Sequence, residues 1–353
     1  MSEETKPKEK RPVRFLSGVQ PSGKLHLGNY FGAIRQHIAL QGEGQCFYFI
    51  ADYHALTTID EAARRRADEL QQKKIDRAAT LRDNTRDVAL DYLALGLDPA
   101  KATFFRQSDV PEVTELAWIL STVTNMGLLQ RAVSYKEKVD NGIDASVGLF
   151  TYPVLMAADI LIVRSNVVPV GKDQVQHLEM TRDMAVKFNE ATGQRIFPLP
   201  DYRLDKAAKV PGVDGRKMGK SYGNTIEIFA EGNPLKKTVM GIVTDSTPMG
   251  QPLDPTTCNV YALISLFAEE AELTELAAQY RAGSIGYGGA KKLLLDKING
   301  YFDPFRQKRK ELAANPDYVE GVLREGAQRA RAEARQTMAL VRQALGMKPA
   351  PLG

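Results

Sequence analysis

Short apolar runs alternate with longer amphipathic stretches over more than half of the chain, and this alternation constrains the fold most strongly. Four apolar runs have the length of buried strands: residues 13–19, 46–51, 103–106 and 167–170. Five longer stretches have the length and composition of helices: residues 28–41, 60–96, 111–120, 149–163 and 173–193. Strands that alternate with helices predict an α/β domain built on a largely parallel, doubly wound sheet.

The pattern changes after about residue 204. A loop rich in Gly, Pro and Lys extends to Gly223, and beyond Ile226 the pattern is almost entirely helical. The first twelve residues carry no apolar side chain after Met1, which is typical of a disordered tail. We therefore predict a disordered tail at 1–12, an α/β domain at 13–225 and a helical domain at 226–353.

Composition argues against several classes of protein. The longest apolar stretch, residues 157–163, is far too short to cross a bilayer, and the N-terminus lacks a signal-peptide core, so we expect a cytoplasmic protein. Cys46 and Cys258 form no Cys-x-x-Cys pair and the four histidines show no metal-ligand spacing, so no disulfide framework or transition-metal site is expected. Residues 291–348 hold 13 Lys or Arg against 7 Asp or Glu, which suits either a polyanion-binding surface or an ordinary solvated helix face.

A turn joins the first predicted strand to the first predicted helix. Its sequence is Gln20-Pro-Ser-Gly-Lys-Leu-His26-Leu-Gly28-Asn29. In a doubly wound sheet, ligands bind beyond the carboxyl ends of the strands, where helix N-termini offer N–H groups to phosphate. Gly28 would let a flat ring approach the backbone, and His26 and Asn29 could donate to phosphate oxygens. Taken alone, the segment is equally compatible with a tight turn that carries a surface histidine.

A second loop carries two lysines and a hydroxyl in the sequence Lys217-Met-Gly-Lys-Ser221, after the segment Val210-Pro-Gly-Val-Asp-Gly-Arg216. Such a loop can close on a triphosphate and neutralise charge that moves to a leaving pyrophosphate. By itself the string is also compatible with a solvated basic loop. Its occurrence together with the first turn favours a nucleotide site.

The apolar stretch after residue 151 carries one carboxylate. Tyr152, Met156 and Asp159 are spaced i, i+4, i+7 and so share one face of a predicted helix. Tyr and Met at this spacing are usually core residues, but a carboxylate among Ala, Ile and Leu is costly unless a donor bonds to it. A ligand with an apolar body and one N–H, such as indole, meets this requirement.

Together these segments resemble the class I aminoacyl-tRNA synthetases. His26-Leu-Gly28-Asn29 is similar to the "HIGH" element and residues 217–221 resemble the "KMSKS" loop, in the order and spacing of a Rossmann-type catalytic domain. Residues 152–162 are similar to the specificity helix of tryptophanyl-tRNA synthetases. The resemblance covers residues 14–229. It implies a ligase that activates L-tryptophan with ATP and Mg²⁺, transfers it to tRNA(Trp), and acts as a homodimer.

The resemblance also implies roles for individual residues. Asp159 would accept the indole N–H, Gln174 and Tyr152 would hold the α-amino group, and Gly171 and Asp173 would hold the ribose. The implied tryptophan site comprises Tyr152, Met156, Asp159, Val168, Val170, Gln174 and His54. The implied nucleotide site comprises Gln20, Pro21, Ser22, His26, Gly28, Asn29, Gly171, Lys172, Asp173, Val210, Lys217, Met218, Gly219, Lys220 and Ser221. Three lysines would neutralise phosphate charge in catalysis: Lys138, Lys217 and Lys220.

Some of these residues also have a purely structural interpretation. His54 could be a packed core residue and Asp173 a helix cap. Gly219 replaces the middle serine of the loop motif, and Leu16 stands where many relatives have phenylalanine. These two departures leave the rate of loop closure and the breadth of the substrate pocket open.

Three other interpretations remain at this stage. They are a tyrosine-specific synthetase, a small nucleotidyltransferase, and a synthetase paralogue that has become a binding partner. A further expectation concerns arginines in the C-terminal helical stretch, which would contact the tRNA. They are Arg324, Arg329, Arg331, Arg335 and Arg342.

Overall fold

The computed structural model describes residues 13–69, 71, 75–132, 146–171, 174–204 and 210–348. The tail predicted at 1–12 lies outside them. Five parallel strands form one sheet in the order β3-β2-β1-β4-β5. The strands are β1 (Arg14–Val19), β2 (Gln45–Ile50), β3 (Ala102–Arg106), β4 (Val167–Val170) and β5 (Asp201–Leu204). The predicted α/β class with a parallel sheet is confirmed.

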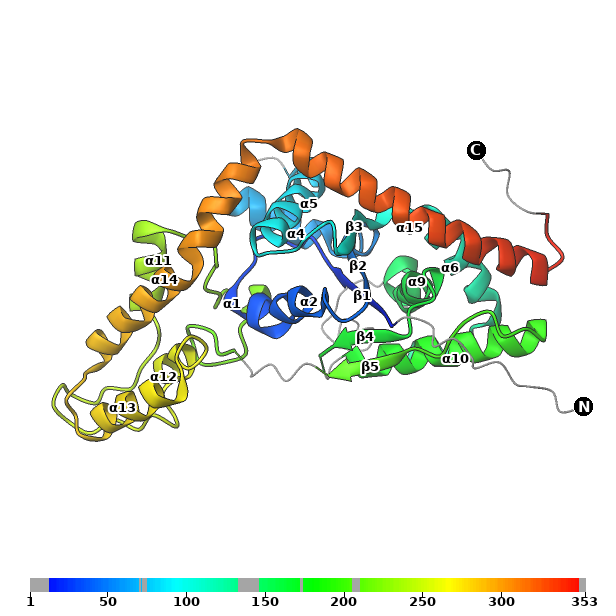
Figure 1. Ribbon diagram of the computed structural model, residues 1–353. Helices are drawn as coiled ribbons and strands as arrows, with labels where there is room; N and C mark the ends of the chain where they lie inside the picture. Colours follow the sequence, from blue (N-terminus) through cyan, green and yellow to red (C-terminus); the bar gives the residue numbers. More distant parts are fainter. Residues whose placement is uncertain are drawn as a thin grey trace, which may run out of the picture.

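Side-chain alternation along the strands explains why helices cover both faces of the sheet (Figure 1). On β1, Phe15 belongs to one buried cluster and Leu16 to another, and on β3 Phe104 and Phe105 divide in the same way. Successive side chains of a strand point to opposite faces, so an apolar run without alternating polar residues needs cover on both sides. The helices of the sheet region are α1 (Leu27–Asn29), α2 (Arg35–Leu40), α3 (Asp52–Ala55), α4 (Ile59–Glu69), α5 (Arg77–Ala94), α6 (Glu112–Val123), α7 (Met126–Gln130), α9 (Val147–Ile162) and α10 (Val175–Thr192).

Two helix predictions need correction. The stretch 60–96 forms two helices instead of one, because Asp76 caps α5 by accepting from Ala79 N at 2.9 Å and Gln71 has a φ of +52°. The helix after the first turn contains a π-helical segment, η1 (Tyr30–Ile34), between α1 and α2. By contrast, Gly193 ends α10 at a φ of +64°, as a C-terminal glycine is expected to do. Strand β5 was not predicted because its four residues are all exposed.

The described chain beyond residue 226 is mostly helical, as predicted, but residues 241–258 form a loop without a helix. Short helices form an arm to the left in Figure 1, and two long helices lead back from it. They are α11 (Gly232–Met240), α12 (Asn259–Ile264), α13 (Glu270–Arg281), α14 (Tyr287–Ala313) and α15 (Pro316–Ala344). Asn315 caps α15 by accepting from Tyr318 N at 3.3 Å, and the helix then crosses the sheet domain beside β3 and α6.

Contacts with the sheet domain change the expectation for the α15 arginines. Arg331 and Arg335 both donate to Glu112, and Arg342 pairs with Glu115 at 2.7 Å. Arg329 donates to the carbonyl of Pro99 at 2.9 Å. Four of the five arginines that the sequence suggested for RNA contact therefore fasten α15 to the sheet domain.

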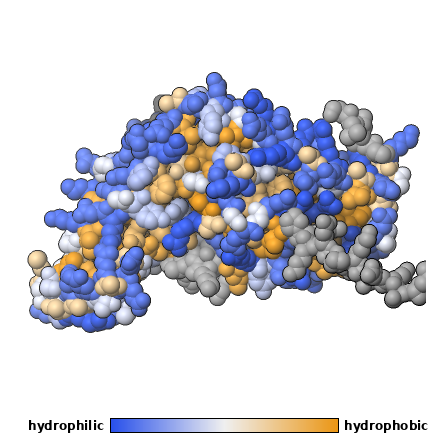
Figure 2. Space-filling view, viewed as in Figure 1, coloured by the Kyte–Doolittle hydropathy of each residue, from blue (hydrophilic) through white to orange (hydrophobic). Residues whose placement is uncertain are grey.

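Figure 2 shows where hydrophobic side chains reach the surface in this view: in its middle, near its right-hand edge and on the arm at the left, among hydrophilic side chains. None of the helices described is both long and apolar enough to cross a membrane.

Two glycines of α15 provide a matched test of this docking. A Cβ at Gly326 would lie 1.7 Å from the carbonyl oxygen of Phe104, whereas a Cβ at Gly321 would meet nothing within 4 Å. We expect Gly326→Ala to lower the melting temperature, since overpacking costs about 1–3 kcal/mol. Gly321→Ala should raise it slightly, because Ala exceeds Gly by about 1 kcal/mol in helix propensity. Equal melting temperatures for the two variants in a thermal unfolding scan would contradict the close approach of α15 to β3.

Candidate active site

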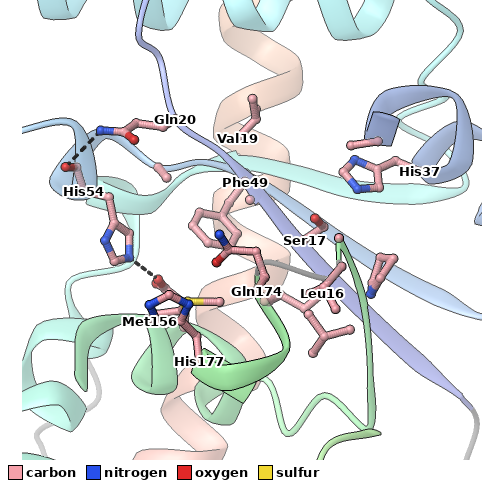
Figure 3. A pocket seen from close by; sticks show the side chains of 18 of the residues that line it. Leu16, Ser17, Val19, Gln20, His37, Phe49, His54, Met156, Gln174 and His177 are labelled. Atoms are coloured by element: carbon pink, nitrogen blue, oxygen red, sulfur yellow. Dashed lines mark hydrogen bonds and ion pairs between the residues drawn. The ribbon is translucent and has the colours of Figure 1, made fainter. Parts of the chain in front are cut away.

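A cavity of about 480 Å³ opens at the carboxyl ends of β1 and β4. The strand order reverses between these two strands, so the cavity lies at the topological switch point where doubly wound sheets bind ligands. Figure 3 shows side chains from β1, β2, α9 and α10 directed into it. The lining includes all seven residues that the sequence suggested for tryptophan: His54, Tyr152, Met156, Asp159, Val168, Val170 and Gln174.

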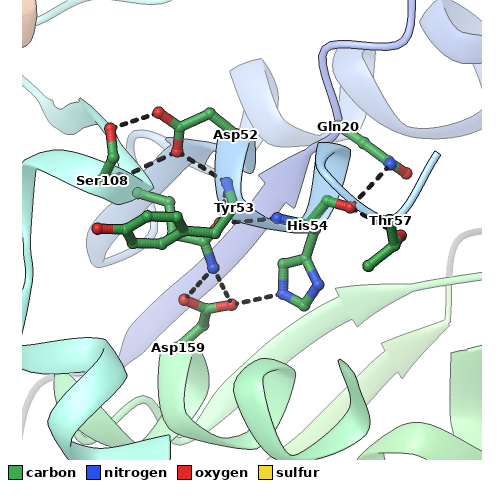
Figure 4. Close-up of polar contacts among 8 residues, drawn as sticks. Gln20, Asp52, Tyr53, His54, Thr57, Ser108 and Asp159 are labelled. Carbon is green, nitrogen blue, oxygen red and sulfur yellow. Dashed lines mark hydrogen bonds and ion pairs between the residues drawn. The ribbon is translucent and has the colours of Figure 1, made fainter. Parts of the chain in front are cut away.

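The buried carboxylate of α9 is bonded from two sides. Gln107 Nε2 donates to both oxygens of Asp159, at 2.8 and 2.9 Å, and His54 Nε2 lies 3.0 Å from Oδ2 (Figure 4). Asp159 is 4% exposed. Burial raises the pKa of Asp159, while the donors His54 and Gln107 act in the opposite direction.

These bonds correct the inference from the sequence that the Asp159 carboxylate needs a ligand to donate to it. The protein itself offsets the cost of burying Asp159, so the carboxylate does not require a ligand. A carboxylate has about four acceptor positions, however, and three are used by the contacts with Gln107 and His54. One position on Oδ1 remains for a donor in the cavity.

Tyr152 and Met156 line the cavity with Asp159, which confirms that the three share one helix face. The Tyr152 hydroxyl contacts His177 Nε2 on α10. Gln174, which precedes α10, lines the cavity as well. The structure therefore brings polar groups of α9 and of the start of α10 together in the cavity.

The first turn is built around a buried histidine. His26 is buried, and its backbone N–H donates to Asn29 Oδ1 at 3.1 Å. Burial and the nearby charge of Lys220 lower the pKa of His26 to about 4, so the ring is neutral at pH 7. The alternative of a surface histidine in a plain tight turn is thereby excluded. Gln20 Nε2 donates to Thr58 Oγ1 at 2.8 Å, and Pro21 accepts from Asn84 at 3.2 Å.

The lysine loop packs directly on this turn, although nearly 200 residues separate them in sequence. Lys220 Nζ donates to Ser22 Oγ at 3.2 Å and to the Gly23 carbonyl at 2.8 Å. The N–H of Gly28 lies 3.4 Å from Met218 Sδ. Burial, with a further contribution from Arg65, lowers the pKa of Lys220 to about 8.

Other predicted nucleotide residues lie away from this contact. Lys217 and Val210 line a separate hollow of about 230 Å³ together with residues 256–259. Ser221 is exposed, and Gly219 donates to Asn224 Oδ1 at 2.8 Å. The structure therefore separates the two lysines of the loop: Lys220 contacts the first turn, whereas Lys217 lines the second hollow.

Three predicted residues, Lys138, Lys172 and Asp173, lie outside the described residues. Within the described part of the chain, no group of three His, Cys, Asp or Glu side chains could hold a metal ion.

Two residues that organise the site were not found from the sequence. Asn224 is buried and bonds Gly219 N, the Lys217 carbonyl and Asp214 Oδ1, and so fixes the lysine loop. Its role depends on a loop that folds back on itself, for which the sequence gives no periodic signal. Gln107 follows directly after β3. A polar residue at the carboxyl end of a predicted parallel strand was a usable signal that the sequence analysis missed.

Comparison with known proteins agrees with this geometry. The family model described as "tRNA synthetases class I (W and Y)" matches residues 8–303. A tryptophan–tRNA ligase of Fusobacterium nucleatum is 51% identical over 335 residues, which cover 95% of this chain and 98% of the relative. One of Rhodopirellula baltica is 51% identical over 337 residues, covering 95% of this chain and 100% of the relative. The chain belongs to the tryptophan–tRNA ligase family.

A solved structure of the family is similar over almost the whole chain. The tryptophanyl-tRNA synthetase of Campylobacter jejuni, crystallised with ADP and tryptophan, matches with a TM-score of 0.84 and 46% identity. The match covers 95% of this chain and 100% of that one. The family suggested by the two sequence motifs and the α9 segment is thus confirmed, and the Rossmann-type class I fold with it.

Proposed function

We propose that this protein is a tryptophan–tRNA ligase that activates L-tryptophan with ATP and transfers it to tRNA(Trp). The observation that carries the proposal is the single cavity at the switch point, which collects all seven side chains expected for the amino acid. The nucleotide turn borders the same cavity through Gln20 and Asn29. One pocket is therefore placed to hold an amino acid beside a nucleotide.

The indole ring would lie between apolar walls with its nitrogen toward Asp159. Met156, Val168 and Val170 supply apolar surface, and the open acceptor position of Asp159 Oδ1 would receive the N–H. Met156 offers no hydrogen-bond donor of its own to a phenol hydroxyl, which favours tryptophan over tyrosine. Tyr152 and Gln174 would bind the α-amino group.

The triphosphate would lie across the first turn, with the lysine loop closed over it. Lys220 is already bonded to Ser22 and Gly23 of this turn, so its charge stands where phosphates would bind. Mg²⁺ would enter with ATP, held by the phosphates and water, because this ion commonly relies on substrate oxygens. Bound there, it would neutralise part of the phosphate charge.

In the first step the tryptophan carboxylate would attack the α-phosphorus in line. A new carboxyl oxygen–phosphorus bond forms, the bond from the α-phosphorus to the bridging oxygen breaks, and pyrophosphate leaves with its electron pair. Lys220, together with Lys217 and Lys138, would balance the charge on that leaving group. In the second step a ribose hydroxyl of the tRNA terminus attacks the activated carbonyl. The new ester bond forms, the bond from the carbonyl carbon to the phosphate oxygen breaks, AMP leaves with that electron pair, and the hydroxyl proton is released.

The remaining parts of the chain would serve the tRNA. We assign residues 13–225 to activation and residues 226–353 to tRNA binding, although α15 also packs on the sheet domain. Because the product is used in translation, we place the enzyme in the cytoplasm.

A homodimer would explain three large apolar side chains that are exposed at the surface of the sheet domain. Trp118 of α6 is 73% exposed, and Met126 of α7 and Val147 of α9 are also exposed. Large exposed apolar side chains on a folded domain often mark an interface. We propose that this surface contacts a second copy of the chain.

The proposed function is tested by ATP–pyrophosphate exchange with tryptophan, tyrosine and phenylalanine, followed by aminoacylation of tRNA(Trp). Tryptophan should support both reactions. Phenylalanine should be poorer by about 10⁴-fold in kcat/KM, since it leaves the acceptor on Asp159 unpaired. Exchange with tyrosine as fast as with tryptophan would reject the assignment.

The charge of Lys220 should produce an alkaline limb in the pH profile. A lysine with a lowered pKa is charged below it and neutral above it, so kcat/KM for ATP should fall as pH rises through about 8. Lys220→Arg should remove this limb, because arginine stays charged. Lys220→Ala should cost at least about 10²-fold in activation at pH 7 with little change in the KM for tryptophan.

The control for this series is Lys101→Ala, which removes an exposed lysine that is paired with Asp98 and lies outside the first turn. It should leave the profile unchanged. If kcat/KM for ATP of Lys220→Arg still falls at the same pH as that of the unmodified enzyme, a group other than Lys220 causes the fall.

The dimer proposal predicts that Trp118→Glu lowers the mass of the assembly, because a charge would be placed in a contact between copies. Light scattering after size exclusion over a range of concentrations measures the change. Met249→Glu is the control, since Met249 is 90% exposed but lies in the helical arm. A Trp118→Glu protein with the same mass as the unmodified one would argue against this surface.

A further inference from the structure

Gln107 lies between the carboxylate of Asp159 and the start of α3. It belongs to the short helix η2 (Gln107–Asp109) after β3, and no part of it is exposed. Its Oε1 accepts from the backbone N–H of Tyr53 at 3.1 Å and of His54 at 3.4 Å. Its Nε2 donates to both oxygens of Asp159. Two donors at one end and an acceptor pair at the other fix the orientation of the amide.

The surroundings of Gln107 form a rigid frame. Asp52 Oδ1 accepts from Tyr53 N at 3.1 Å and from Ser108 N at 2.9 Å, so η2 and α3 are joined a second time beside the amide (Figure 4). Neither Gln107 nor Asp159 can turn without breaking buried hydrogen bonds. Such breakage leaves buried polar groups unpaired and costs about 1–3 kcal/mol for each group.

The contacts of Asp159 leave a directional acceptor. Oδ2 is contacted by both Gln107 and His54, whereas among the residues that the structure describes Oδ1 is contacted by Gln107 alone. Since each carboxylate oxygen has two acceptor positions, the open position belongs to Oδ1. A donor that enters the cavity must therefore approach one oxygen from one direction.

We propose that Gln107 is a positioning residue that determines specificity. It holds Asp159 so that a single acceptor position faces the cavity, and this acceptor position selects a bicyclic ring with one N–H. The inference rests on the proposed function, in which that ring is the indole of L-tryptophan. Gln107 acts through Asp159 and does not itself line the cavity.

A purely structural role for Gln107 would predict a different result. If the amide only satisfied the buried carboxylate, its loss would weaken folding and all substrates alike. If it aims the acceptor, its loss would harm ligands with the N–H more than ligands without it. The ratio of kcat/KM for L-tryptophan to that for 3-benzothienylalanine, in which sulfur replaces the N–H, separates the two roles.

Gln107→Glu is the most informative variant, because it changes only the end of the side chain that donates to Asp159. It keeps an oxygen for the N–H groups of Tyr53 and His54, but places a second oxygen where Nε2 donates to Asp159. Gln107→Met removes both ends of the amide at similar size. Ser108→Ala is the matched control, because its hydroxyl contacts Asp52 in the same frame and leaves Asp159 untouched.

We expect both Gln107 variants to lower the ratio at least about 10-fold at pH 8 in ATP–pyrophosphate exchange, the size of one charge-assisted hydrogen bond. Ser108→Ala should keep the ratio of the unmodified enzyme. The ratio of Gln107→Glu should recover as the pH falls, because a protonated carboxylic acid can again donate to Asp159. No such recovery should occur in Gln107→Met.

Each outcome has a defined meaning. An unchanged ratio in both variants, or a ratio of Gln107→Glu that does not depend on pH, overturns the proposal. Unfolding of both variants in a melting experiment also overturns it, because Gln107 is then a folding residue. The unmodified enzyme tests the proposed function separately: no exchange with tryptophan, or no preference for the N–H, rejects that function whatever the variants do.

Discussion

The hydrogen bonds around the buried carboxylate of Asp159 join three segments that are far apart in the chain. Gln107 comes from the end of β3, His54 from α3 after β2, and Asp159 from α9. A carboxylate in an apolar helix would otherwise destabilise the fold, because removal of a charge from water is costly. The same bonds that offset this cost close one end of the cavity and fix its polar group. Under the proposed function, stability and ligand selection at this end therefore depend on one set of contacts.

The opposite end of the site depends on a contact of a different kind. Lys220 is bonded to two neutral oxygens, those of Ser22 and Gly23, and burial lowers its pKa to about 8. Its charge is thus incompletely stabilised in the free protein. Under the proposed function, a triphosphate would supply the missing negative charge. Phosphate binding and closure of the lysine loop on the first turn would then favour each other, since each stabilises the same ammonium group.

The sequence predicted those strands and helices whose burial requires recognisable runs of apolar residues. Four strands were found because strands covered on both faces are nearly continuous apolar runs, whereas β5 is exposed at its four positions and has no such run. The break between α4 and α5 was missed because it depends on a local cap at Asp76. Residues of the cavity were found through family motifs and through the misfit of Asp159 in an apolar helix. Asn224 was not, since it acts through contacts formed only after the chain has folded, and Gln107 was overlooked although it stands at the carboxyl end of a predicted strand.

The position of α15 shows how tertiary structure can change the meaning of a charge pattern. Its arginines gave the C-terminal region a basic excess in the sequence, yet Glu112 neutralises Arg331 and Glu115 neutralises Arg342. β3 is the edge strand on this side of the sheet, and α15 runs beside it with Gly326 against the carbonyl of Phe104. An uncovered edge strand invites pairing with other chains. Because Gln107 follows β3 directly, cover of this edge by α15 also supports the segment that holds Asp159.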